Sequence, residues 1–335
     1  MSPDLRATEK SVAELIGKLK DLKKEISKVI IGQEEIIDQL LITFLAGGHA
    51  LLEGVPGLAK TLMIRSLSEA IDLRFRRIQF TPDLMPSDII GTEVLEEDHT
   101  TGKRIFKFNK GPIFANIILA DEINRTSPKT QSALLEAMQE FEVTYAGTTY
   151  PLERPFFILA TQNPIEQSGT FPLPEAQLDR FLLYIKVGYP TAEEEVAILT
   201  NTTGKKGSAI QKVMEGTKIL EAQKLVRDVH INNDLIDLVS RIVRATRAEK
   251  SELKFVNEWV RWGAGPRAGQ AMILTAKARA LLHGNFSVTQ EDIQHVAYPV
   301  LRHRILMNFK AEAEGVTSND VTKHLLESIT TRKSL

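Results

Sequence analysis

The sequence contains no cysteine, so its 335 residues can form neither a disulfide nor a thiolate site. Its 42 basic and 43 acidic residues leave a net charge of -1, so no strong overall field draws the chain to nucleic acid or anionic lipid. The seven histidines lack metal-binding spacing such as HExxH, and no nucleophile elbow or Ser-His-Asp pattern is present. These absences argue against thiol, zinc and serine-hydrolase chemistry.

Long apolar runs are missing as well. The most apolar stretches, residues 36–48 and 113–120, are too short to span a bilayer and have charged neighbours. The amino-terminal segment MSPDLRATEKSV has no apolar run of the kind found in signal peptides. We therefore expect no transmembrane segment, no membrane insertion and a cytoplasmic protein.

The spacing of apolar residues predicts an α/β region followed by a helical region. Apolar residues at helical spacing indicate helices over residues 12–29 and 34–46. Short runs rich in β-branched residues then predict buried parallel strands, separated by helices, at residues 50–52, 75–80, 117–120, 156–160 and 182–187. This alternation is typical of a doubly wound α/β layer.

Strand-like runs stop after the segment Gly-Tyr-Pro-Thr at residues 188–191, and helical patterns follow. Thr289 and Asp292 have the spacing of a capping box at the start of the last of these helices. The expected helices cover residues 193–201, 218–229, 234–247, 267–283 and 290–304. We therefore expect two domains, an α/β core over residues 1–190 and an α-helical domain over residues 191–335.

Two segments interrupt the α/β pattern. Residues 92–109 place the turn residues Asp98, Thr100 and Gly102 between two strand-like runs, which predicts a hairpin. Residues 141–151 have a similar pattern around Ala-Gly-Thr and predict a second hairpin. A long surface loop is the alternative for either segment.

A phosphate-binding loop is predicted between the first strand and the next helix. Its backbone N–H groups and the helix start would face the β- and γ-phosphates of ATP, Lys60 would neutralise phosphate charge, and the Thr61 hydroxyl would bind Mg²⁺. Ala59 departs from the strict pattern, which has glycine before the lysine. The candidate nucleotide-binding residues are Gly54, Val55, Pro56, Gly57, Leu58, Ala59, Lys60, Thr61 and Leu62.

Two later strands end in polar residues that suit the same chemistry. Asp121 could hold the Mg²⁺ water shell and Glu122 could polarise the attacking water. The alternative is an acidic pair at a helix start. Asn163 follows another strand and could orient the water or contact the γ-phosphate, while the alternative is a turn-forming Asn-Pro step.

Six motifs together resemble the MoxR family of AAA+ ATPases, and they extend over nearly the whole chain. They are GVPGLAKT at residues 54–61, LADEINR at 119–125, ATQNP at 160–164, LPEAQLDRF at 173–181, GPRA at 265–268 and VLRHRI at 300–305. The resemblance implies an AAA+ nucleotide-binding core, a C-terminal helical lid and assembly into a ring, commonly a hexamer. It also implies helix-2 and pre-sensor-1 hairpin insertions, and the two predicted hairpins occupy those places.

Matched to the family's motifs, Lys60 and Thr61 belong to Walker A, Asp121 and Glu122 to Walker B, and Asn163 to sensor 1. The resemblance implies that these residues bind ATP with Mg²⁺ and hydrolyse it to ADP.

Arg180 matches the arginine finger, which would reach a neighbouring subunit's γ-phosphate and be worth about 10³ to 10⁵ in rate. The alternative is a surface arginine paired with Asp179 or a nearby glutamate. Arg267 matches sensor 2, and the sequence leaves open whether it acts on its own nucleotide or on a neighbour's.

Two further assignments follow from the same resemblance. Gly32 and Gln33 precede a helix where the family holds adenine, although Gly32 could equally be a plain turn residue. Arg125 could be a further contact between subunits or a salt bridge at a helix start.

Three functions remain open at this stage. The resemblance favours a chaperone-like ATPase that remodels or matures protein clients, by enzyme-complex assembly or metal insertion, with a partner that carries a von Willebrand A domain. The second is a DNA-acting AAA+ motor, which four basic residues of the first hairpin would suit, although the neutral charge balance argues against nucleic acid. They are Lys103, Arg104, Lys107 and Lys110. The third is a nucleotide-gated scaffold without turnover.

Overall fold

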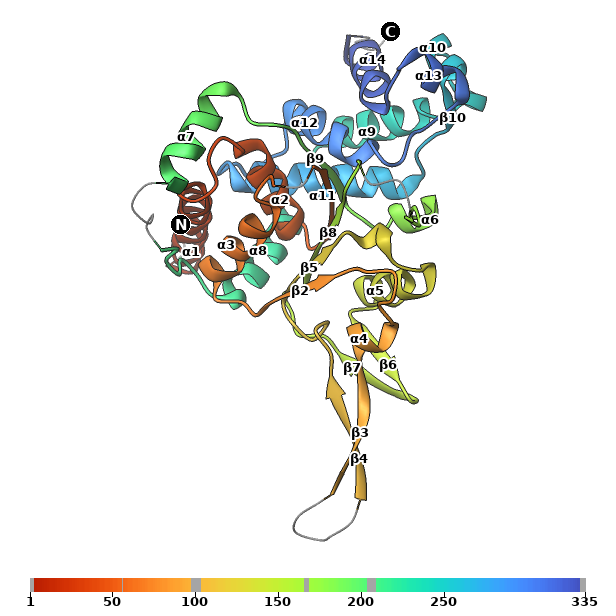
Figure 1. Ribbon diagram of the computed structural model, residues 1–335. Coiled ribbons are helices and arrows are strands. Elements are labelled where there is room, and N and C mark those ends of the chain that lie inside the picture. The colour runs from red at the N-terminus through yellow and green to blue at the C-terminus, as the bar shows by residue number, and fades with distance from the viewer. Residues whose placement is uncertain (1–2, 56, 98–103, 166–168, 204–208, 332–335) are drawn as a thin grey trace.

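The computed structural model describes residues 3–55, 57–97, 104–165, 169–203 and 209–331 (Figure 1). Pro56 of the predicted phosphate loop lies outside these ranges, as do Lys103 and the turn residues Asp98, Thr100 and Gly102.

The centre of the fold is a five-stranded sheet in the order β2-β5-β8-β1-β9. All neighbouring strands in it are parallel. The apolar runs become strands because both faces of a parallel sheet are covered by helices. The five predicted strands are confirmed as β1 (Ala50–Gly54), β2 (Phe75–Gln79), β5 (Ile117–Asp121), β8 (Phe157–Gln162) and β9 (Leu183–Val187).

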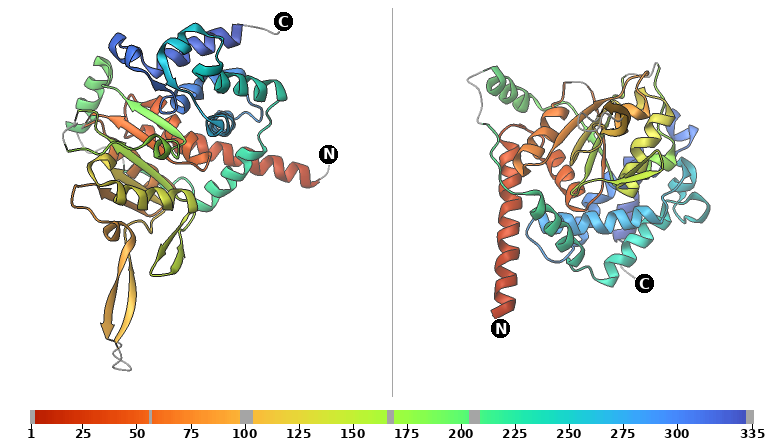
Figure 2. Two further views of the ribbon diagram at one scale, coloured as in Figure 1. Left: turned by 90° about the vertical axis from the view of Figure 1, so that its right-hand side faces the viewer. Right: turned by 90° about the horizontal axis from the view of Figure 1, so that it is seen from below.

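Helices cover both faces of the sheet (Figure 2). One face packs against α1 (Pro3–Ser27), α2 (Glu34–Leu45) and α3 (Lys60–Ile71), and the buried stripe of α1 consists of Leu15, Leu19, Leu22 and Ile26. The other face packs against α4 (Pro86–Ile90) and α5 (Pro128–Glu140). This arrangement confirms the doubly wound α/β class.

Both hairpin predictions are confirmed. β3 (Gly91–Glu97) pairs with β4 (Arg104–Lys110), and β6 (Glu142–Tyr145) pairs with β7 (Thr148–Pro151), each antiparallel. The β3–β4 hairpin projects far from the body of the molecule (Figure 1). Near the base of the β3–β4 hairpin, the Phe108 ring stacks on Tyr150 with centroids 4.5 Å apart and on Tyr145 at 5.1 Å, so the β6–β7 hairpin supports this base.

The predicted later helices are confirmed as α7 (Ala192–Thr203), α8 (Gly216–Asp228), α9 (Asn233–Ala245), α11 (Pro266–Leu282) and α12 (Gln290–Leu301). The capping box is present, since the Thr289 hydroxyl accepts from the Asp292 N–H at 3.2 Å and the Asp292 carboxylate accepts from the Thr289 N–H at 2.8 Å.

The prediction that strands stop after β9 is wrong. Val260–Trp262 (β10) pairs with Leu306–Met307 (β11), and these strands are too short to give an alternating pattern. The sequence also missed three helices, α10 (Lys254–Trp259), α13 (Phe309–Glu314) and α14 (Ser318–Thr331), and the short α6 (Glu175–Leu178) before β9.

The helix α11 joins the C-terminal helices to the core. It packs against α1 and α2 on one side and against α8, α9 and α12 on the other, while α12 packs on the edge strand β9. The proposed division into residues 1–190 and 191–335 stays a prediction. No helix within the described ranges has the length and apolar content needed to cross a lipid bilayer.

Candidate functional site

The loop between β1 and α3 has the backbone of a phosphate site. Gly57 and Ala59 both adopt left-handed conformations, with φ of 87° and 54°. Ala59 therefore has the conformation that explains why glycine is expected there, because a Cβ in this region costs roughly 1–2 kcal/mol. Ala59 is also the residue before α3, and its apolar side chain cannot cap the helix. The first-turn N–H groups of α3 are thus suited to an anion.

Lys60, the first residue of α3, faces the predicted Walker B carboxylates. Its Nζ donates to the backbone oxygen of Gly54 at 2.6 Å. Partial burial lowers the pKa of Lys60, and the charges of Asp121 and Glu122 raise it. Thr61 follows on the exposed side of the first turn, together with Leu62. The loop, the amine and the two carboxylates therefore meet at one end of the sheet.

Asp121 ends β5 at this same edge of the sheet. Its Oδ1 accepts a hydrogen bond from the Thr161 hydroxyl at 2.6 Å, and its Oδ2 accepts from Nη2 of Arg77 at 2.7 Å. A carboxylate and a hydroxyl are the hard oxygen donors that Mg²⁺ prefers. Asp121 and Thr61 are therefore the residues that would hold a magnesium ion, and such an ion would neutralise phosphate charge.

Glu122 follows in a left-handed conformation, with φ of 57°. Its Oε2 accepts from Nε2 of Gln79 and from Nη1 of Arg125, both at 2.9 Å. Only a three-residue 3₁₀ turn (Ile123–Arg125) follows Glu122, and α5 begins at Pro128. The acidic pair thus directly precedes this short 3₁₀ turn and does not stand at the start of an α-helix. The salt bridge expected as one alternative for Arg125 is present, and its contact between subunits stays a prediction.

Asn163 follows β8, the strand between β5 and β1 in the sheet. It is buried, and its Oδ1 accepts from the backbone N–H of Ile165 at 3.1 Å. The turn that an Asn-Pro step favours is therefore present. Its strand nevertheless lies between the strand that leads into the phosphate loop and the strand that ends in the Walker B pair, so the turn does not exclude a role of Asn163 at the phosphates.

The candidate adenine segment lies between α1 and α2. Gly32 has φ of 75°, and a Cβ there would come within 2.3 Å of the Glu194 side chain on α7. Gln33 directly precedes α2, and its side chain makes no capping hydrogen bond to the helix. Its Oε1 is buried, and no partner for it exists among the residues that the structure describes. An unpaired buried acceptor suits a donor such as the adenine amino group.

The two candidate sensor and finger arginines lie at the opposite edge of the sheet. Arg180 precedes β9, whose first residue, Leu183, is level with Ala50 at the start of β1. β1 has five residues that rise about 3.3 Å each, so the two ends of the strands, and with them Arg180 and the phosphate loop, lie roughly 15 Å apart. Arg267 starts α11 beside the same segment, 3.8 Å from Asp179. Neither guanidinium lies on the side of its own phosphate loop.

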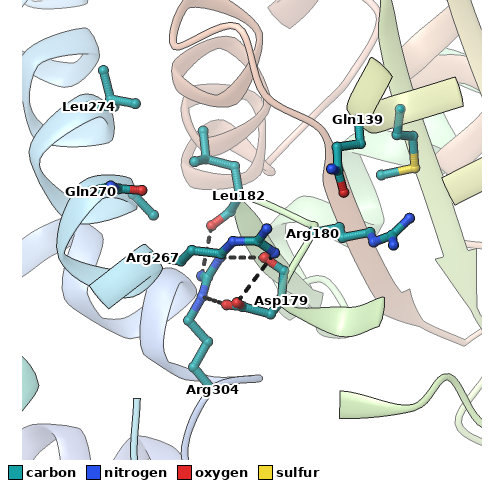
Figure 3. A pocket seen from close by; sticks show the side chains of 10 residues that line it. Gln139, Asp179, Arg180, Leu182, Arg267, Gln270, Leu274 and Arg304 are labelled. Carbon is teal, nitrogen blue, oxygen red and sulfur yellow. Dashed lines mark hydrogen bonds and ion pairs between the residues drawn. The ribbon is translucent and has the colours of Figure 1, made fainter. Parts of the chain in front are cut away.

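These arginines line a pocket of about 220 Å³ between α5, α11 and the segment before β9 (Figure 3). The pairing with Asp179, which is one form of the alternative for Arg180, is not present. Asp179 instead pairs with Arg304 at 2.7 Å and with Arg267. Arg180 is exposed and donates to the backbone oxygen of Leu135 at 2.9 Å.

Sequence reasoning missed several partners of these residues. Gln79 ends β2 and has the polar strand-end signal that identified Asn163. Glu194 approaches Gly32 only through the packing of α7, and Arg304 is 125 residues from Asp179. The missed residues are Arg77, Gln79, Thr161, Glu194 and Arg304.

Comparisons with known proteins agree with this geometry. The profile of the ATPase family associated with various cellular activities (AAA) matches residues 49–183, and an AAA lid domain matches residues 254–325. Chaperone MoxR1 of Mycobacterium tuberculosis is 42% identical over 306 residues, which span 91% of this chain and 80% of that protein.

Two further comparisons cover nearly the full chain. The uncharacterised protein YeaC of Bacillus subtilis is 40% identical over 96% of this chain and 97% of its own length. The crystal structure of a candidate ATPase from Cytophaga hutchinsonii superposes with a TM-score of 0.90 at 43% identity, and it covers 97% of this chain and 98% of its own. With its parallel sheet, phosphate loop and lid, the chain belongs to the MoxR family of AAA+ ATPases.

Proposed function

We propose that this protein hydrolyses Mg²⁺-bound ATP as a ring, commonly a hexamer, in which each subunit completes its neighbour's site. The observation that carries the proposal is the position of Arg180 and Arg267 at the sheet edge opposite their own phosphate loop. A guanidinium so far from its own nucleotide can act on phosphate only across a subunit interface. In this proposal Arg267 acts in trans, on the nucleotide of the adjacent subunit, and not on its own.

The residues have complementary roles in this proposal. Lys60 and the loop N–H groups hold the phosphates, and Thr61 and Asp121 hold Mg²⁺. Glu122 polarises the attacking water after its carboxylate has released the hydrogen bonds from Gln79 and Arg125. Asn163 orients that water from the neighbouring strand. Arg180 and Arg267 of the adjacent subunit stabilise charge on the transferred phosphoryl group.

We further propose a chaperone-like role in the cytoplasm, in which hydrolysis drives movements that remodel or mature a protein client. The β3–β4 hairpin supports this role because it presents the exposed apolar side chains Val94, Leu95 and Phe106 far from the body. Enzyme-complex assembly or metal insertion with a von Willebrand A-domain partner is the form that the family resemblance implies. The name of the relative MoxR1 also describes a chaperone.

The hairpin's charges do not favour a DNA-acting motor. Lys107 pairs with Glu96 at 3.0 Å across the two strands. The described basic residues of β4, Arg104, Lys107 and Lys110, are equal in number to the acidic residues of β3, namely Glu93, Glu96 and Glu97. A surface with this balance has little net attraction for a phosphate backbone.

The test is steady-state ATP hydrolysis with Mg²⁺ over a range of protein concentrations. The native chain is compared with Glu122→Gln, Arg180→Ala and the control Arg241→Ala, an exposed lid arginine paired with Asp237. We expect specific activity to rise with concentration, Arg180→Ala to lose about 10³-fold or more, and the control to keep native activity.

Mixing the two inactive variants tests the shared site directly. A subunit with Arg180→Ala keeps its own carboxylates, and a neighbour with Glu122→Gln supplies the arginine. Activity should therefore reappear in the mixture. Concentration-independent activity, or a mixture that stays inactive, would contradict the shared site, and no turnover in the native chain would favour the scaffold.

A further inference from the structure

The Asp179 carboxylate lies between two arginines of the C-terminal helices and the loop that carries Arg180 (Figure 3). Its Oδ1 accepts from Nε of Arg304 at 2.7 Å, and its Oδ2 lies 3.8 Å from Nη1 of Arg267. Asp179 is directly bonded to Arg180 in sequence. One carboxylate therefore connects the lid to the loop of the candidate finger.

The two lid arginines at Asp179 have different surroundings. The Arg304 side chain is only 4% exposed, whereas that of Arg267 is 56% exposed. Arg304 also donates to backbone oxygens on both sides of the junction, those of Asp179, Phe181, Leu182 and Val300. Arg304 is thus fixed in the interface, while Arg267 remains available at its rim.

The neighbouring side chains strengthen the same junction. Arg302 donates to the backbone oxygen of Tyr184 at 2.5 Å. Nε2 of His303 lies 3.1 Å from the backbone oxygen of Phe181. Three successive side chains from the end of α12 therefore hold the segment from the Arg180 loop into β9. Asp179 supplies the negative charge at this junction, because the other acceptors of Arg304 are neutral carbonyl groups.

We propose that Asp179 is a positioning residue, which holds Arg304 and Arg267 against the loop so that Arg180 and Arg267 reach a neighbour's nucleotide as one unit. This inference rests on the proposed ring ATPase and adds a residue to it. Asp179 lies at the edge of the sheet opposite its own phosphate loop. Its loss should therefore lower kcat without weakening nucleotide binding to the same subunit.

The first test is Asp179→Asn, which keeps the shape and removes the charge. A misplacement of about 1 Å can cost about 10²-fold, so we expect kcat to fall roughly 10- to 100-fold. The affinity for a fluorescent ATP analogue, measured on the same protein, should stay at its native value. Asp237→Asn is the matched control, because Asp237 forms an exposed ion pair with Arg241 within α9.

Mixed assemblies distinguish positioning in trans from damage to the variant's own site. Asp179→Asn subunits keep their Walker residues, and Glu122→Gln subunits keep an intact Asp179. Adding the second to the first should raise hydrolysis per Asp179→Asn subunit several-fold. A mixture no more active than Asp179→Asn alone would overturn the proposal. A kcat above the native value in Asp179→Asn would also overturn it, because Asp179 would then restrain Arg267.

A second variant covers the case in which Asp179→Asn is unstable, because it leaves the Arg304 charge buried. The double change Asp179→Asn with Arg304→Met removes both charges together. We expect this protein to fold, to be slow and to be rescued by Glu122→Gln subunits, and native activity in it would overturn the proposal. Concentration-independent hydrolysis by the native chain would instead overturn the proposed function. An unchanged kcat in Asp179→Asn, with concentration-dependent native hydrolysis, would overturn the positioning role alone.

Discussion

Acidification should destabilise this protein through His49, which is buried beside the start of β1. Its Nδ1 accepts from the Ile158 N–H at 3.1 Å, so Nε2 carries the proton and donates to the Met138 backbone oxygen at 3.0 Å. Burial lowers the pKa of His49 from 6.5 to about 4, against a smaller opposite effect of the bond to Met138. The neutral ring thus links β8 to α5.

The sign of the effect follows from the proton uptake of the two states. In the unfolded chain His49 gains a proton below pH 6.5, whereas in the folded chain it stays neutral down to about pH 4. The unfolded state binds more protons in this window, so the free energy of unfolding falls as the pH falls. The loss is about 2 kcal/mol at pH 5 and about 3 kcal/mol at pH 4, and the contribution is fully present above about pH 7.

Urea unfolding at pH 7 and pH 5 measures this loss. His49→Gln keeps an acceptor and a donor but cannot take up a proton, so its loss between the two pH values should be about 2 kcal/mol smaller than native. Carboxylates and the buried His303 titrate in both proteins and cancel in the difference. An equal loss in His49→Gln and the native chain would refute the reasoning.

Two further predictions concern the nucleotide site. Ala59→Gly should raise the free energy of unfolding, measured in urea without nucleotide, by up to about 1 kcal/mol. The relief of the left-handed strain exceeds the extra entropy of glycine in the unfolded chain, and a variant less stable than the native chain would contradict this. Arg77→Ala removes a competitor of Mg²⁺ for Asp121, and this pair, in which Arg77 is exposed and Asp121 is largely buried, is worth about 1 kcal/mol. The Mg²⁺ concentration for half-maximal hydrolysis should thus fall by up to about five-fold, and a Mg²⁺ titration that shows an unchanged or higher requirement would count against it.

The parts of the fold that could be predicted depend on local signals. Strands such as β5 and β8 are apolar along their whole length because both of their faces are buried, so they are recognisable without tertiary information. The phosphate loop is also local, since β1, the glycines, Lys60 and α3 follow one another directly. Even Ala59, the departure from the motif, retains the backbone that the motif requires.

The parts that could not be predicted depend on contacts between distant segments. Asp179 has Arg180 as its neighbour in sequence, yet it pairs with Arg304 because the end of α12 packs on β9. The side of the sheet on which Arg267 lies follows from the docking of α11, and no local pattern contains that information. β10 and β11 were missed for a different reason, since strands of three and two residues are too short to show an alternating pattern.

The side chains that cover β9 also have a consequence for the solubility of the protein. The outermost strand of a sheet offers unpaired backbone groups, which can template the addition of a strand from another molecule and so begin aggregation. Along β9 and the segment before it, the backbone oxygens of Phe181, Leu182 and Tyr184 already accept bonds from residues 302–304. The addition of a strand from another copy of this chain is therefore hindered at the start of β9.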